Sequence, residues 1–154
     1  FHSTLEEAAS AGLVLIVCVY SNPAVENQLE VTRKLLDDLG CGGIPTITVY
    51  NKIDCCPNPE TLTGSDRTVF ISGLKQWNID ILLRTIEQAL SAQMCRVMLE
   101  IPYNRGELLS QLRERGHVFE EEFLEDRVRV DVNIDRKLLK ALLPYRCDAE
   151  GASV

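Results

Sequence analysis

The chain has 154 residues, of which 45% are hydrophobic, enough apolar material for one ordinary domain or two small ones with a real core. Its 16 Lys and Arg against 23 Asp and Glu give a net charge of -7, which disfavours nonspecific binding to nucleic-acid phosphates. No apolar stretch approaches the roughly 20 residues that span a bilayer, and no signal-peptide pattern is present, which predicts a cytoplasmic protein without a membrane partner.

The first apolar stretch of the chain predicts a buried strand followed by a helix. Residues 13–19, with the sequence LVLIVCV, form a continuous apolar run that is typical of a strand covered on both faces in a parallel sheet. Asn22 and Pro23 then provide a capping residue and a first helical residue, and Gly40 ends the amphipathic pattern that follows.

Two more strands and a helix complete the first part of the chain. Residues 44–50 and 68–72 have apolar strand patterns, and Asn78 can cap an amphipathic helix that runs to residue 92. The alternation of strands and helices predicts a parallel sheet with right-handed crossovers. Three strands are few for such a sheet.

From residue 95 onward the pattern is that of strands with one buried face. Residues 95–101 alternate apolar and polar side chains. Asn104 and Glu107 then form a capping-box start for a helix that Gly116 ends.

A hairpin and a short helix complete the second part of the chain. Residues 117–123 and 127–134 form the arms of the hairpin, and Asp135 caps a helix that ends before Pro144. The second part is therefore predicted to be a small α+β unit with the element order βαββα. The predicted organisation is a first domain at 1–93, this small domain at 94–147 and a flexible tail at 148–154.

The six cysteines show no Cys-x-x-Cys spacing, which favours reduced thiols over a disulfide framework or a zinc site. Cys18 and Cys95 lie in strand patterns and are expected to be small core residues. The adjacent Cys55 and Cys56 are expected in an ordinary loop, and the glutamates at 120–122 in a solvated hairpin arm. We therefore predict no metal ligands.

The most informative motif is YNKID at residues 50–54, directly after the strand predicted at 44–50. Asn-Lys-x-Asp in this place is how many GTP-binding proteins recognise guanine, and ligands of open α/β sheets bind at the carboxyl edge of the strands. The carboxylate of Asp54 offers two acceptor oxygens to the N1 and N2 donors of guanine, a pair that adenine lacks. The alternative is a surface loop that contains these residue types by chance.

Two further parts of such a site are predicted around this motif. Asn51 would bond the base edge or brace neighbouring loops, and the stem of Lys52 would lie along the face of the base. Where the strand at 68–72 ends, a backbone N–H can donate to guanine O6 and the small Gly73 lets the base approach. The candidate guanine-binding residues are Asn51, Lys52, Asp54, Ser72, Gly73 and Leu74.

The chain as a whole resembles the carboxyl-terminal half of the HflX-type GTPases. The resemblance is carried by FHSTLEEAASAGLVLIVCVYSNP, IPTITVYNKID, VFISGLKQWNIDIL, IPYNRGELLSQLRERG, EEEFLEDRVRVDVNI and LLPY. It is most distinctive after residue 95, in a region that GTPases in general lack. One departure is Cys18-Val19-Tyr20-Ser21, where the family usually has Val-Asp-Ala-Ser, so that any polar contact of the Asp is lost.

The resemblance implies a partial Ras-like GTP-binding domain of three parallel strands with helices, followed by the small α+β domain. It implies that the parent protein hydrolyses GTP, associates with the large ribosomal subunit and separates the ribosomal subunits. GTP or GDP is the implied ligand, and Mg²⁺ is implied only for the intact parent.

Two elements of a complete GTPase are absent from the sequence. There is no Gly-x-x-x-x-Gly-Lys-Ser/Thr loop to hold phosphates, and no Asp-x-x-Gly at a strand end to reach magnesium. Phosphoryl transfer depends on positioning and charge stabilisation, so we predict weak or absent nucleotide binding, no catalytic residues and no GTP hydrolysis by this chain.

A second hypothesis is a nucleotide-independent module that docks the ribosome or another protein through the βαββα unit. A stand-alone flavodoxin-like or receiver-like domain is disfavoured, because it needs about five parallel strands. In a Ras-like sheet, the strand that corresponds to residues 13–19 would normally pair with the strand that leads into the phosphate loop. Here they are expected to form an exposed apolar edge, through which the chain self-associates.

Overall fold

The structure is a computed structural model that describes residues 2–147. The chain divides into two compact units, residues 1–90 and 91–154, and each is considered by itself. The flexible tail predicted at 148–154 lies outside the described residues, and the predicted domain limits stay predictions. No helix in residues 2–147 has the length and apolar character needed to cross a membrane.

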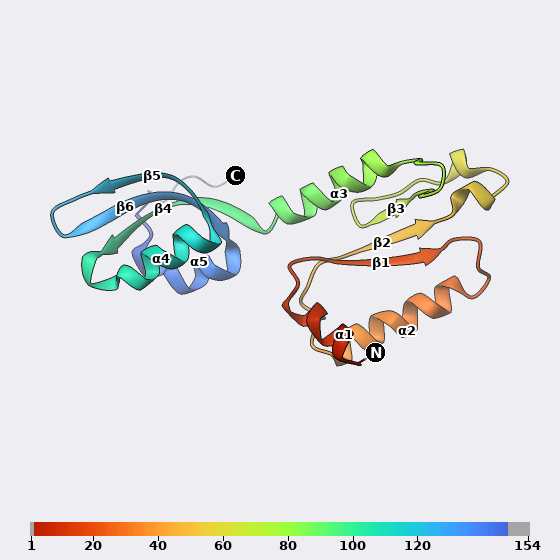
Figure 1. The fold of residues 1–154 in the computed structure, drawn as a ribbon, viewed down its shortest axis with the longest axis horizontal. Coiled ribbons are helices and arrows are strands. Elements are labelled where there is room, and N and C mark those ends of the chain that lie inside the picture. Colours follow the sequence, from red (N-terminus) through yellow and green to blue (C-terminus); the bar gives the residue numbers. More distant parts are fainter. Residues whose placement is uncertain (1, 148–154) are drawn as a thin grey trace. The chain divides into compact units, whose positions relative to one another are not determined.

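The first unit contains a parallel sheet in the spatial order β1-β2-β3 (Figure 1). Its strands are β1 at Val14–Val19, β2 at Thr46–Asn51 and β3 at Thr68–Phe70. Val14 pairs with Thr46, and Thr48 pairs with Thr68. The three parallel strands predicted from the sequence are therefore confirmed, and their carboxyl ends lie at one edge of the sheet.

Two helices cover opposite faces of this sheet. They are α2 at Val25–Asp38 and α3 at Ile79–Ser91, while α1 at His2–Glu6 and a 3-10 helix at Glu7–Ser10 precede β1. Leu29 of α2 packs in a core with Ile16 of β1, and Ile86 of α3 packs in a core with Ile47 of β2. Ile16 pairs with Thr48, the residue that follows Ile47 in β2. Because successive side chains of a strand point to opposite faces, the core of Ile16 and the core of Ile47 lie on opposite faces of the sheet.

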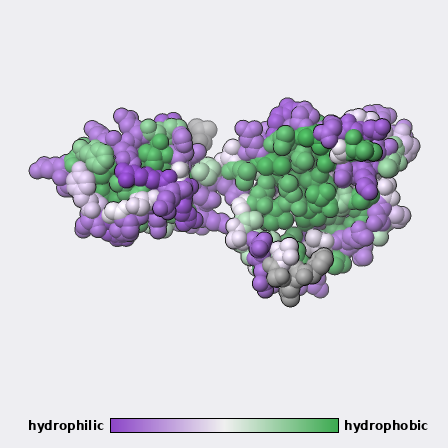
Figure 2. Space-filling model, viewed as in Figure 1, coloured by the Kyte–Doolittle hydropathy of each residue, from purple (hydrophilic) through white to green (hydrophobic). Residues whose placement is uncertain are grey.

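The strand β1 is not covered on both faces, contrary to the prediction for residues 13–19. Leu15 and Val17 are 39% and 60% exposed. They pair with the β2 residues that pack under α3, so they lie on the α3 face, which is open at this edge strand. Figure 2 shows hydrophobic surface gathered on this unit. The expected exposed apolar edge is therefore present, with one open face in addition.

Local hydrogen bonds delay the start of α2. Asn22 does not cap the helix as predicted, because its Oδ1 accepts the Ala24 N–H at 2.9 Å while its carbonyl accepts the Val25 N–H at 3.0 Å. This side-chain turn, typical of Asn, places Pro23 before the helix instead of in its first turn. Gly40 ends the helix as predicted and has the left-handed φ of 82°.

The second unit is an antiparallel sheet in the order β4-β6-β5, with two helices on one face (Figure 1). Its elements are β4 at Met94–Pro102, α4 at Gly106–Arg115, β5 at His117–Phe123, β6 at Arg127–Asp135 and α5 at Arg136–Leu142. Alternate residues of β4 and β6, such as Leu99 and Val130, form one core with Leu112 and Leu142 of the helices. The predicted order βαββα is confirmed.

Helix starts in this unit agree only in part with the sequence. Asp135 caps α5 as predicted, and its Oδ1 accepts a backbone N–H of the first turn at 2.7 Å. The capping box predicted at Asn104 and Glu107 is wrong, because a 3-10 helix at Tyr103–Arg105 precedes α4 and Glu107 pairs with the arginine that ends it.

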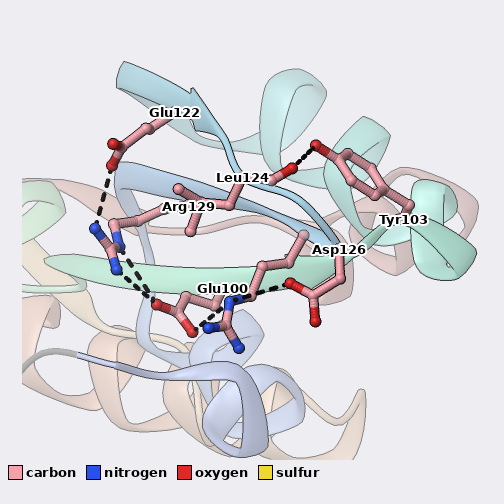
Figure 3. Close-up of polar contacts among 7 residues, drawn as sticks. Glu100, Tyr103, Glu122, Leu124, Asp126 and Arg129 are labelled. Carbon is pink, nitrogen blue, oxygen red and sulfur yellow. Dashed lines mark hydrogen bonds and ion pairs between the residues drawn. The ribbon is translucent and has the colours of Figure 1, made fainter.

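The sheet face opposite this core carries ion pairs (Figure 3). Glu100 of β4 lies 3.0 Å from Arg129 and 3.2 Å from Arg127, and Arg129 also reaches Glu122 at 3.1 Å. Glu121 instead pairs with an arginine of α4 at 2.7 Å, and that guanidinium lowers the pKa of its carboxyl. Successive glutamates of β5 thus use different faces, as predicted. Within residues 2–147 no group of three or more His, Cys, Asp or Glu side chains could hold a metal ion.

Candidate functional site

Parallel pairing brings the two predicted loops together at one edge of the first unit. Tyr50 of β2 pairs with Phe70 of β3, and backbone hydrogen bonds continue beyond the strands. The Ile71 N–H donates to the Tyr50 carbonyl at 2.8 Å, and the Ile53 N–H donates to the Ile71 carbonyl at 3.2 Å. Ile53 and Ile71 are buried, so the residues that follow β2 and β3 run side by side on a packed base.

Asn51 bridges these loops through its side-chain oxygen. Its Oδ1 accepts the Lys52 N–H at 2.8 Å and the Gly73 N–H at 3.0 Å. Of the two roles that the sequence left open for this residue, bracing the neighbouring loop is the one that the geometry shows.

A hydroxyl and a thiol orient the carboxylate of Asp54. The Ser72 hydroxyl donates to Oδ1 at 2.6 Å, and the Cys55 thiol donates to Oδ2 at 3.9 Å. Ser72 is fully buried, and its Oγ also accepts the Lys75 N–H at 3.1 Å. A carboxylate has about four acceptor positions, so both oxygens keep capacity for a ligand. Asp54 can therefore accept two parallel N–H donors without losing its support.

Left-handed backbone is concentrated around this edge. The non-glycine residues with positive φ in residues 2–147 are Lys52 at 63°, Gln76 at 59° and Asn78 at 60°. Such residues are uncommon, and sparsely populated conformations cluster at functional sites. Lys52 makes the turn from β2 into a 3-10 helix at Ile53–Cys55 that carries Asp54.

The loop after β3 is closed by its own hydrogen bonds. Ser72 and Trp77 exchange two backbone hydrogen bonds of 3.2 and 3.0 Å, and Gln76 Nε2 donates to the Gly73 carbonyl at 2.6 Å. Asn78 was predicted to cap α3, but its Nδ2 donates to a carbonyl of β3 at 2.9 Å and only its backbone carbonyl bonds the first turn of the helix. The side chain of Asn78 thus ties the loop to the sheet.

All six predicted residues lie at this edge, and the structure adds neighbours that the motifs did not indicate. Lys52 and Leu74 are exposed, the latter by 82%, while Ser72 is buried. The added neighbours are Cys55, Lys75 and Gln76, which contact Asp54, Ser72 and Gly73 respectively. No spacing in the sequence marks these three, because their contacts depend on the backbone conformation of the loops.

An aromatic cluster occupies the α2 side of the same sheet edge. Tyr50 stacks on Phe70 with ring centroids 5.0 Å apart, and Tyr20 meets both rings edge-on at 5.6 and 5.4 Å. The Tyr50 hydroxyl donates to Glu26 at 3.0 Å, and burial together with this bond raises the pKa of Tyr50. The family usually has Asp at the position of Val19, so a polar contact was expected to be lost there. In this chain the next residue, Tyr20, makes aromatic contacts at that place.

Cys18, Cys41, Cys55, Cys56 and Cys95 are in the thiol form and take part in no disulfide. Cys18 and Cys95 pack in the sheets as predicted, and their thiols donate to the carbonyls of Val49 and Ile134 at 3.6 Å each. Burial raises the pKa of Cys18, so this thiol is kept protonated.

Comparison with known proteins finds relatives for nearly the whole chain. It is 34% identical over 142 residues to the GTPase HflX of Caldanaerobacter subterraneus subsp. tengcongensis, and 34% identical over 153 residues to the GTPase HflX of Akkermansia muciniphila. These matches cover 92% and 94% of the chain and 33% of each relative. A match to the GTPase HflX of Treponema denticola reaches 52% identity over 54 residues, which are 35% of the chain and 14% of that protein. No family model matches the chain.

The similarity relates the chain to proteins of the GTPase class, the class that the Asn-Lys-x-Asp loop on a parallel sheet indicates. Within this class the chain is HflX-like over nearly its whole length, so the family resemblance seen in the sequence is confirmed. The chain spans about a third of the length of the relatives that it matches.

Proposed function

We propose that this chain carries the guanine-reading loops of an HflX-like GTP-binding protein, with Asp54 as the residue that selects the base. The observation that carries the proposal is the support of its carboxylate, which the buried Ser72 holds at 2.6 Å. A carboxylate fixed in this way can pair with N1 and N2 of guanine, whereas adenine leaves it unpaired. In well-formed hydrogen-bonding sites such a mismatch can cost about 10⁴ in selectivity.

The other loop residues have supporting roles in this proposal. Lys52 is exposed beside Asp54, so its stem can lie along one face of the base. Leu74, which is also exposed, offers apolar surface from the other loop. Asn51 keeps both loops at a fixed distance through its two backbone contacts.

The ligand is GTP or GDP, held by its base. The 154 residues contain no phosphate loop, so contacts to the phosphates and to Mg²⁺ belong to the longer protein and the affinity of this chain is weak. For the longer protein we propose a cytoplasmic GTPase that associates with the large ribosomal subunit, as the family resemblance implies. Similarity to GTPases over nearly the whole chain supports this function over a nucleotide-independent docking module.

Binding of GDP and XDP at millimolar concentration tests the role of Asp54. Asp54→Asn replaces one acceptor by a donor, so we expect this variant to lose GDP binding and gain XDP binding, measured by calorimetry or NMR titration. Asp66→Asn makes the same charge change at an exposed loop residue and should leave both affinities unchanged. No GDP binding by the unmodified chain, or no change of preference in Asp54→Asn, would contradict the proposal.

A further inference from the structure

We propose that Gln76 is a positioning residue that aims the Leu74 N–H at the O6 atom of guanine. The inference rests on the proposed guanine recognition and adds a residue to it that no motif contains. It follows from the hydrogen bonds of three successive amides in the loop after β3.

Two of these three amides are already bonded inside the protein. The Gly73 N–H donates to Asn51 Oδ1 at 3.0 Å, and the Lys75 N–H donates to Ser72 Oγ at 3.1 Å. The Leu74 N–H between them has no hydrogen-bond partner within residues 2–147. It is therefore the one of the three that is available to a ligand.

Gln76 fixes the direction of that free amide. The Gly73 carbonyl and the Leu74 N–H belong to the same peptide group, which is planar and trans, so they point in opposite directions. Gln76 Nε2 holds this carbonyl at 2.6 Å. Rotation of the peptide group would break the bond, and the Leu74 N–H is consequently held on the side away from Gln76.

Hydrogen bonds of Ser72 connect the loop of this donor to the carboxylate that is proposed to read the rest of the base edge. Guanine presents an acceptor at O6 followed by donors at N1 and N2, so its site needs one donor followed by two acceptors. Ser72 Oγ bonds both Asp54 and the Lys75 N–H, which ties the two acceptor oxygens to the loop that contains the free amide. Leu74 and Asp54 thus supply the required sequence of groups.

The backbone at Gln76 also indicates a specific role. Its φ is 59°, a conformation for which glycine is the usual residue, and a glycine would have no side chain to bond Gly73. The side-chain hydrogen bond gives a physical reason for glutamine at this position.

The test compares GDP with 6-thio-GDP, which keeps N1 and N2 but replaces O6 by the weaker acceptor sulfur. Binding is measured by NMR titration of the ¹⁵N-labelled chain. For Gln76→Glu and Gln76→Gly we expect roughly a 3- to 10-fold loss of GDP affinity and little change for 6-thio-GDP, because one hydrogen bond loses its alignment. The Leu74 amide proton should shift on addition of GDP to the unmodified chain, and much less in both variants.

Gln76→Gly keeps the left-handed backbone and removes the side chain, whereas Gln76→Glu keeps the shape and removes the donor. Gln88→Glu, on the exposed side of α3, repeats the charge change away from the site and should behave like the unmodified chain. If the Gln76 variants lose affinity equally for GDP and 6-thio-GDP, or lose affinity for neither, the role of Gln76 is overturned while guanine recognition stands. If the unmodified chain binds no GDP, the proposed function fails and this inference with it.

Discussion

The hydroxyl of Ser72 joins the two loops of the candidate site. It donates to Asp54 at 2.6 Å and accepts the Lys75 N–H at 3.1 Å, in a fully buried position. One small side chain therefore supports both the carboxylate and the loop that carries the free amide of Leu74.

Ser72→Ala should weaken both stability and binding. The change leaves the Lys75 N–H without its acceptor and Asp54 Oδ1 without its hydroxyl donor, and such losses cost about 1–3 kcal/mol. Urea unfolding of the first unit can be followed through Trp77, the only tryptophan. Ser91→Ala, at an exposed position at the end of α3, is the control, and an equal stability of Ser72→Ala and this control would contradict the expectation.

At the scale of residues, the sequence predicts those site residues whose chemistry requires a fixed residue type at a fixed spacing. An amide at Asn51 and a carboxylate at Asp54 after a strand are sufficient to indicate guanine recognition. Gln76 carries no comparable signal, because its contact with Gly73 exists only when its backbone is left-handed. The role of Asn51 as a bridge likewise depends on how closely the second loop approaches.

At the scale of elements, α4 ends at Gly116, where the surrounding core leaves no space for a side chain. Gly116 stops the helix as predicted. A Cβ atom at Gly116 would lie 2.7 Å from Ile134 Cγ2 and 2.9 Å from the Leu112 carbonyl. Both neighbours are buried in the core, so neither can move away without a cavity or a clash elsewhere.

Gly116→Ala should therefore destabilise the second unit by about 1–3 kcal/mol, the usual cost of overpacking a core. Hydrogen exchange of the β6 amides measures the opening of this unit directly. Gly106→Ala is the matched control, because a Cβ atom there meets nothing within 4 Å and alanine favours the helix that starts at this residue. Equal exchange rates in the two variants would show that the close contacts at Gly116 relax freely.

Elements were predictable where burial leaves a periodic pattern. β4 and β6 bury alternate residues such as Leu99 and Val130, and this alternation is visible in the sequence. The apolar run of β1 suggested two covered faces, but composition does not show that α3 leaves Leu15 and Val17 open. The starts of α2 and α4 were missed because a turn and a 3-10 helix take the place of the predicted caps.

At the scale of the whole molecule, the open edge strand favours self-association. Leu15 and Val17 combine exposed apolar surface with the unpaired edge of β1. We expect the average mass in analytical ultracentrifugation to rise with concentration, and Val17→Lys to reduce this rise. Val31→Lys is the control, since Val31 on α2 is 61% exposed against 60% for Val17 but is not in the edge strand. A strictly monomeric chain at high micromolar concentration would contradict the expectation.

The same chain should not hydrolyse GTP. Its candidate site is proposed to contact only the base, and the sequence contains no phosphate loop. Positioning of the phosphates is the main source of catalysis in phosphoryl transfer. Phosphate release assays should show no turnover above a protein-free blank. Turnover that scales with chain concentration and disappears in Asp54→Ala would prove this prediction wrong.

The bridge between Ser72 and Trp77 gives the molecule an optical reporter of its own. The indole is 43% exposed, and two backbone hydrogen bonds join its residue to the one that holds Asp54. Because indole emission depends on contact with water, a ligand that orders the loops after β2 and β3 should change the wavelength and the intensity of the emission. Weak ligands of this chain can therefore be screened by the intrinsic fluorescence of Trp77, without a label on either the protein or the nucleotide.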